Sequence, residues 1–173
     1  METVMERRPG LGVAPWWLIH SRPRQEKRVA AWLEREGFDV DLPLRPRVKV
    51  YPGKRVTFHH PVFPGYVFGA FPAQAKNTVY GSGHVAAILE VADQGRLKRE
   101  LAALHQALEA GCELEEVGFL RVGQRVRITA GRLRGLEGIL VRRAGRSRLV
   151  LSVEMVQRSV ALELDPEWVE PSV

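Results

Sequence analysis

The stretch Pro61-Val62-Phe63-Pro64-Gly65-Tyr66-Val67-Phe68 decides much of the fold. Pro64-Gly65 predicts a turn into a strand over 65–71, because glycine tolerates the backbone angles of tight turns. Alternate side chains of a strand share one face, so Tyr66 and Phe68 are expected on the same side of a sheet. The pattern alone fits buried core rings and an exposed aromatic surface equally well.

A basic hairpin is expected immediately before this stretch. Residues 45–58 alternate between apolar and basic side chains around Tyr51-Pro52-Gly53-Lys54. Pro followed by Gly at the two central positions favours a type II turn. The segment therefore predicts two antiparallel strands joined by a tight turn.

Working outward toward the N-terminus, Trp16-Trp17-Leu18-Ile19-His20 is aromatic and β-branched, which predicts a strand. A helix is expected from Ser21 and Pro23 to about Glu36, since Pro is tolerated in a first turn. Gly37 predicts the end of this helix. Its expected buried stripe consists of Val29, Trp32 and Leu33.

Toward the C-terminus, the sequence predicts a short helix over 72–80, a strand over 85–91 and a long helix over 93–110. The leucines of the long helix recur at helical spacing, namely Leu97, Leu101, Leu104 and Leu108. Hairpins and helices mix without a regular strand–helix alternation. This favours an α+β domain in which the helices pack on one face of an antiparallel sheet.

The pattern of the sequence changes after residue 118. Short alternating strands are expected around Val126-Ile128, Ile139-Val141, Leu149-Val153 and Val160-Leu162, punctuated by glycines. This predicts a small all-β barrel of about five strands. The expected organisation is a loose tail over 1–14, an α+β domain over 15–111, a linker over 112–118 and the barrel over 119–173.

Composition limits the classes of function. The 173 residues carry a formal net charge of +6 with a sequence pI of about 10.0, which favours polyanion partners. Basic segments over 1–60 and 119–173 flank an acidic one over 61–118. Cys112 is the single cysteine, so no intramolecular disulfide is expected. With no signal peptide and no apolar span, the chain is expected in the cytoplasm, without a membrane partner.

Signatures of catalysis and of cofactors are absent from the sequence. The spacing of Gly81-Ser82-Gly83-His84-Val85-Ala86 fits the G-x-G-x-x-A pattern of dinucleotide-binding sites. That pattern requires a strand before it and a helix after it, whereas here it follows a helical stretch and no helix begins at it. His59 and His60 are neighbours on a strand, so they point to opposite faces and do not share a metal ion. We therefore expect no catalytic residues, no metal site and no cofactor.

Three motifs in order resemble the NusG family of transcription elongation factors. The string over 61–68 is similar to the family signature, and the segment 16–20 followed by Glu26 is similar to its opening strand and helix. Residues 122–138 resemble a KOW motif, carried by Val126, Ile128, Gly131, Gly135 and Gly138. The resemblance implies an NGN-like N-terminal domain followed by a KOW domain with an SH3-like barrel.

The resemblance also implies a set of partners. An apolar sheet face would bind the clamp helices of the largest RNA polymerase subunit, and two further residues would touch the opposite pincer. The implied polymerase contacts are Trp16, Leu18, His20, Phe63, Pro64, Tyr66, Phe68, Asn77 and Thr78. Non-template DNA of the transcription bubble is expected beside the first helix, at Arg22, Arg24, Gln25 and Arg28. Arg24, Arg28 and Arg35 are expected to form one stripe of that helix.

Departures from the family pattern indicate a specialised paralogue of the RfaH or UpxY kind. Arg22-Pro23-Arg24-Gln25 replaces a Tyr-Ser-Gly-type segment, and the loop between Val91 and Leu97 is shorter than in the family. The function implied is processive elongation or antitermination. A NusG-like pausing or Rho-dependent termination factor remains an alternative, as does a ribosome-associated RNA-binding protein. The KOW domain would bind ribosomal protein S10 or Rho. Its Val- and Ile-rich alternation with several glycines favours a stable barrel over the helical hairpin that one relative forms.

Overall fold

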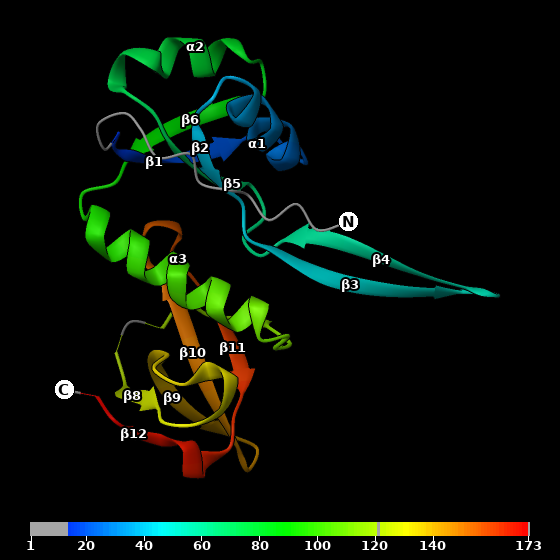
Figure 1. The fold of residues 1–173 in the computed structure, drawn as a ribbon, viewed down its shortest axis with the longest axis vertical. Helices are drawn as coiled ribbons and strands as arrows, with labels where there is room; N and C mark the ends of the chain where they lie inside the picture. Colours follow the sequence, from blue (N-terminus) through cyan, green and yellow to red (C-terminus); the bar gives the residue numbers. More distant parts are fainter. Residues whose placement is uncertain (1–13, 121, 173) are drawn as a thin grey trace.

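The computed structural model describes residues 14–120 and 122–172, so the tail expected over 1–14 lies almost wholly outside the described residues. The N-terminal part is built on a four-stranded antiparallel sheet with the order β2-β5-β1-β6 (Figure 1). Its strands are β1 (Trp16–Ser21), β2 (Asp39–Asp41), β5 (Tyr66–Ala70) and β6 (Val85–Glu90). The strands expected at 16–20, 65–71 and 85–91 are confirmed to within a residue at each end.

Two helices cover one face of this sheet. They are α1 (Glu26–Arg35) and α2 (Lys76–Gly81), the latter preceded by a 3₁₀ turn over Ala73–Ala75. Alternate residues of β1, Trp17 and Ile19, pack with Val29 and Leu33 of α1, as the predicted stripe requires. The start of α1 was predicted wrongly: it begins at Glu26 because Arg24 has a φ of +59°, which a helix cannot contain.

The third helix, α3 (Gln94–Glu109), lies on the opposite face, between the sheet and the C-terminal strands (Figure 1). The Asp93 side chain caps it by accepting a hydrogen bond from the Arg96 amide at 2.8 Å, and Gly111 follows its end with a φ of +75°. The prediction of helices on one face is therefore wrong, since helices cover both.

The expected hairpin is confirmed as β3 (Leu44–Tyr51) and β4 (Lys54–Pro61), a two-stranded arm that projects from the body (Figure 1). Gly53 has the positive φ of +74° that a type II turn requires. His59 lies opposite Pro46 and His60 opposite Arg45, so the two histidines point to opposite faces of the arm.

The C-terminal part is a six-stranded antiparallel sheet with the order β12-β8-β9-β10-β11-β7. The strands are β7 (Glu115–Val117), β8 (Gln124–Ile128), β9 (Glu137–Arg143), β10 (Arg146–Val153), β11 (Arg158–Glu163) and β12 (Val169–Pro171), with 3₁₀ turns over Gly131–Leu133, Glu154–Val156 and Pro166–Trp168. All four expected strand segments are confirmed. The predicted linker contains β7, which pairs with β11 and so belongs to the sheet.

This sheet buries one face in a shared apolar cluster. Leu149, Leu151, Val160 and Leu162 lie in the same cluster as the leucines of α3. Within the described residues, the edge strands β7 and β12 do not pair with each other, so the sheet order is open. None of the helices in that same part of the chain is long and apolar enough to cross a membrane.

Candidate docking and nucleic-acid surfaces

Strand register defines the face that was expected to bind polymerase. Leu18 of β1 lies opposite Phe68 of β5 and Leu89 of β6, and His20 lies opposite Tyr66 and Ala87. Side chains that are directly opposite in an antiparallel pair share a face. The expected set on β1 and β5 is therefore one surface, as the parity of the sequence predicted.

Most of that surface is covered. Leu18 and Phe68 are both 0% exposed, and both lie in one apolar cluster with Leu97, Leu101 and Leu104 of α3. Phe63 is also a core residue, at 2% exposure. The expectation that Leu18, Phe63 and Phe68 form an open docking surface is therefore wrong.

The short connection after β6 explains the covering. Strand β6 ends at Glu90 and α3 begins at Gln94, so the helix turns back across the sheet at once. The Gln94 side chain then pins α3 to β1, accepting from the Trp16 amide at 2.8 Å and donating to the Trp16 carbonyl at 2.9 Å. A leucine stripe placed there buries itself against the nearest apolar face.

Part of the face stays open. His20 is exposed and stacks on the half-buried Tyr66, with ring centroids 5.2 Å apart. Pro64 beside them is exposed, and Trp16 at the other end of the face is half-buried. Leu89 of β6 points to the same face, opposite Leu18, and is 47% exposed because the cover by α3 does not reach it. We call the uncovered residues His20, Tyr66 and Leu89 the open row. Leu89 was not predicted from the sequence, because the sequence does not show that β6 lies beside β1 in the sheet.

The turn that presents Tyr66 is held by a buried carboxylate. Glu26, at 8% exposure, accepts a hydrogen bond from the Gly65 amide at 2.7 Å. Gly65 has a φ of +88°, and a Cβ there would lie 3.5 Å from the His20 ring. Glu26 thus joins the first helix to the turn. The sequence shows only that Glu26 is an acidic residue in the first turn of a helix. Such residues usually serve to stabilise the helix dipole, so the bond to Gly65 was not predicted.

The residues expected beside DNA gather on the loop between β1 and α1. Arg22, Arg24 and Arg28 are exposed, and the half-buried Gln25 side chain contacts His84 Nδ1 at 2.6 Å. The Arg22 amide donates to the His84 carbonyl at 2.8 Å, which fixes the loop against the segment before β6. Because Arg24 precedes the helix, the predicted stripe of three arginines is wrong and only Arg28 and Arg35 share a helix face.

Asn77 and Thr78 lie on α2 and are exposed. This helix covers the face of the sheet opposite to α3 (Figure 1). The structure therefore places them on the other side of the sheet from the open row of His20 and Tyr66.

The KOW-like residues have structural roles. Val126 and Ile128 are buried in the core, and Gly131 and Gly135 have φ values of +72° and +86°. A Cβ on Gly138 would lie 2.7 Å from the Val150 carbonyl oxygen, so this glycine allows β9 to approach β10 closely. Gly131 and Gly135 therefore shape a turn, and Gly138 shapes the pairing of two strands.

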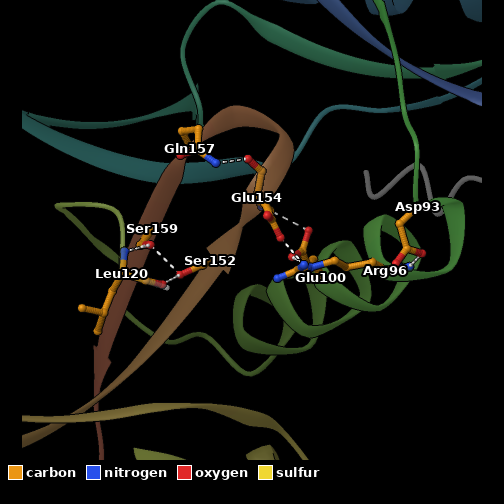
Figure 2. A network of polar contacts seen from close by, with 8 residues as sticks. All are labelled: Asp93, Arg96, Glu100, Leu120, Ser152, Glu154, Gln157 and Ser159. Carbon is orange, nitrogen blue, oxygen red and sulfur yellow. Dashed lines mark hydrogen bonds and ion pairs between the residues drawn. The ribbon is translucent and has the colours of Figure 1, made fainter. Parts of the chain in front are cut away.

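A polar network joins α3 to the C-terminal sheet (Figure 2). Arg96 pairs with Glu100 at 3.0 Å and with Glu154, and the Glu154 amide donates to Glu100 Oε2 at 3.3 Å. Burial raises the pKa of Glu100 above its usual range, although the hydrogen bond from Arg96 opposes the shift. Further along the sheet, the Ser152 hydroxyl lies 2.6 Å from that of Ser159 and donates to the Leu120 carbonyl. The two parts of the chain are therefore in specific contact.

The chemical groups that these surfaces present are few in kind. In the described ranges 14–120 and 122–172, no three His, Cys, Asp or Glu side chains gather in a way that would hold a metal ion. The pKa of the Cys112 thiol is raised by burial, which disfavours the reactive thiolate. What the geometry offers is an aromatic row, a basic loop and a basic arm.

Comparison with known proteins gives the family. In the crystal structure of the MjSpt4:Spt5 complex in conformation B, a chain with 17% sequence identity matches over 90% of this chain and 95% of its own length, with a TM-score of 0.25. The family model described as NusG, transcription termination factor nusG, matches residues 14–100. That range contains the whole four-stranded sheet and the first half of α3. Because it covers half of the chain, this chain belongs to the NusG family of transcription factors.

Proposed function

We propose that this protein is a transcription elongation factor that binds the clamp helices of RNA polymerase and promotes processive elongation or antitermination. The observation that carries the proposal is the open row formed by His20, Tyr66 and Leu89. Aromatic and aliphatic side chains on a rigid sheet are good anchors for a helical partner. The row is small, so the full contact would also use the half-buried Trp16 and the exposed Pro64.

The proposed mechanism is mechanical. Asn77 and Thr78 on α2 are exposed on the side of the sheet away from α3. A protein that holds the clamp helices on one side and the opposite pincer on the other hinders opening of the clamp. Closed polymerase pauses less, so elongation becomes more processive.

Leu18 and Phe68 would join the contact only after α3 moves. In the structure the leucines of α3 occupy the place that a clamp helix would take on that part of the face. Docking through the open row needs no such change. The proposal therefore places the first contact at His20, Tyr66 and Leu89.

A second proposed contact is with non-template DNA through Arg22, Arg24, Gln25 and Arg28. The three arginines are exposed and adjoin the turn at Gly65 through Ser21 and Glu26. Cations in this position would bind phosphates and add affinity without reading base sequence. DNA would then pass beside the polymerase-binding row.

The C-terminal sheet is proposed to act as a KOW domain that closes into an SH3-like barrel and binds ribosomal protein S10 or Rho. The short loop before α3 and the Arg22-Pro23-Arg24-Gln25 segment support a specialised paralogue of the RfaH or UpxY kind, which acts in the cytoplasm. A run-off transcription assay with and without Rho separates the antitermination role from a termination role. Readthrough that falls when Rho and this protein are added together would reverse the assignment.

The docking surface is tested by the double substitution of Tyr66→Ala with Leu89→Ala. We expect affinity for core polymerase to fall by about 30-fold or more, which corresponds to the roughly 2 kcal/mol that defines an interface hot spot. The matched control is Tyr51→Ala with Val50→Ala, an exposed aromatic and an exposed aliphatic on the arm. Phe68 is unsuitable, because truncating a fully buried Phe costs about 3–5 kcal/mol of folding stability.

Equal affinities for the docking variant and the control would contradict the docking surface. A folded state must be verified for both by circular dichroism and thermal unfolding. Loss of binding in the control alone would move the docking site from the sheet to the arm.

A further inference from the structure

The two-stranded arm β3–β4 is a strongly basic element. Over 44–61 the sequence has five cationic residues, Arg45, Arg47, Lys49, Lys54 and Arg55, and no Asp or Glu. The last four are exposed, and no ion pair joins any of them to a carboxylate in the part of the chain that the structure describes. Elsewhere the chain does pair its arginines, for example Arg146 with Glu163 at 2.7 Å. The arm therefore presents unneutralised positive charge.

Register separates the side chains of the arm into two unlike faces. Arg47 lies opposite Phe58, Lys49 opposite Val56, and Tyr51 opposite Lys54, so these residues share one face. We call this set, together with Arg45 and His60, the cation–aromatic face. The other face carries Val48, Val50, Thr57 and His59 with a single cation, Arg55.

The aromatic rings on the cation–aromatic face are open to solvent. Tyr51 is 47% exposed and Phe58 is 38% exposed. Lys49 Nζ lies 5.6 Å from the centroid of the Phe58 ring, and the ring of His60 lies 6.4 Å from that of Phe58. Rings interleaved with cations on a strand surface suit bases that stack and phosphates that pair with the cations.

We propose that the cation–aromatic face of the arm binds a single strand of DNA. Phosphates would pair with Arg47, Lys49 and Lys54, and bases would stack on Phe58 and Tyr51. A duplex fits less well, because its bases are already stacked on each other and cannot cover the rings. The choice of DNA over RNA rests on the proposed function, in which the protein sits beside an open DNA strand.

The test uses the purified full chain and fluorescein-labelled dT12, with binding followed by fluorescence anisotropy. Lys49→Ala and Arg55→Ala remove the same charge from the same arm, but from opposite faces. For a single strand, each phosphate contact contributes about 0.7 to the steepness with which log affinity falls against log salt concentration. Loss of one contact therefore weakens binding about fivefold at 0.1 M salt. We expect Lys49→Ala to weaken binding about fivefold and Arg55→Ala to change it by less than twofold.

Stacking is tested without a change of charge by Phe58→Leu. Loss of base–aromatic stacking should weaken dT12 binding by roughly 5- to 150-fold. Binding of the wild-type protein to duplex DNA and to rU12 should be no tighter than to dT12.

Several outcomes would overturn the proposal. Equal effects of Lys49→Ala and Arg55→Ala, or no effect of Phe58→Leu, would leave only unspecific attraction of a polyanion. Tighter binding of rU12 or duplex DNA would reject the single DNA strand as the ligand. Because no polymerase is present, these outcomes are separate from failure of the docking proposal, and Lys49→Ala should leave polymerase affinity unchanged.

Discussion

At the scale of single residues, Glu26 is the clearest case of a side chain that joins local structure to the proposed site. Its carboxylate is buried and accepts from the Gly65 amide at 2.7 Å, at the turn that leads into Tyr66. A buried amide that loses its acceptor costs about 1–3 kcal/mol. We expect Glu26→Ala to lower the free energy of unfolding by that amount, measured by urea denaturation.

Two variants make the test of Glu26 specific. Glu26→Gln keeps an oxygen that can accept from Gly65 and should lose less stability than Glu26→Ala. Lys27→Ala changes the exposed neighbour on the same helix and should be close to neutral. Similar losses in Glu26→Ala and Lys27→Ala would mean that the hydrogen bond contributes nothing beyond helix content.

Arg24 combines an unfavourable backbone with an exposed charge. Its φ of +59° lies in the left-handed region, which costs an L-residue other than glycine about 1–2 kcal/mol. Arg24→Gly should therefore raise thermal stability while weakening the proposed contact with non-template DNA. Ala144→Gly is the matched control, because Ala144 also has a positive φ, of +51°, but lies in the turn between β9 and β10.

The control should gain stability with no change in DNA contact, which can be followed by crosslinking to the upstream bubble in an elongation complex. If Arg24→Gly gains stability and keeps full DNA contact, Arg24 does not touch DNA. Backbone strain of this kind was invisible in the sequence, where Pro23 favoured a helix start instead.

At the scale of elements, the sequence predicted those helices and turns that depend on residues close together in the chain. The turn at Pro52-Gly53 and the leucine period of α3 were both read correctly, because each depends only on near neighbours in the chain. The covering of Leu18 and Phe68 was missed because it depends on where α3 packs. Apolar residues on a strand do not reveal whether their cover is another protein or the same chain.

Strand β7 shows the same limit for polar segments. Glu115 and Glu116 made residues 112–118 resemble a linker, yet they pair with Arg148 and Arg158 beside the edge of the sheet. The partners are distant in sequence, so charge composition alone could not place them. An acidic edge strand beside a basic sheet is held partly by these pairs.

At low pH, β7 should separate from the sheet before the other strands do. The hydrogen bond from Arg148 holds the pKa of Glu115 below its usual range. A lowered folded-state pKa contributes stability that is present above the unfolded pKa, near 4.3, and is lost as the pH falls through the folded value. Amides of β7 should exchange faster at about pH 3 than at pH 6, after correction for intrinsic rates, while amides of β10 stay protected.

Arg148→Gln is the control for acid release. It should loosen β7 already at pH 6 and remove most of the pH dependence. Unchanged protection of β7 between the two pH values in the wild-type chain would show that backbone pairing with β11 is sufficient.

At the scale of the whole molecule, α3 is shared between two parts. Its leucines lie in one cluster with Leu18 and Phe68 of the first sheet and with Leu149 and Leu151 of the second. Its polar side carries Arg96 and Glu100, which meet Glu154 (Figure 2). A change at this contact should therefore alter how the two parts move relative to each other without unfolding either sheet.

Reversing one charge tests this coupling. Arg96→Glu would place a third carboxylate beside Glu100 and Glu154, where half-burial already raises the pKa of Glu100. Like charges in a partly desolvated site repel more strongly than on an open surface. We expect the C-terminal sheet to tumble faster and more independently, seen as different rotational correlation times for the two parts by NMR relaxation, with the effect reduced at high salt.

Lys98→Glu makes the same charge change two residues along the helix, at an exposed position, and should leave the common tumbling intact. Separation in Arg96→Glu would also free one side of α3, so binding of polymerase should be measured on the same sample. Tighter binding would indicate that α3 competes with the clamp helices for Leu18 and Phe68, whereas unchanged binding would confine docking to the open row. A single correlation time in both variants would mean that the apolar cluster alone holds the two parts together, and that the polar network only selects their orientation.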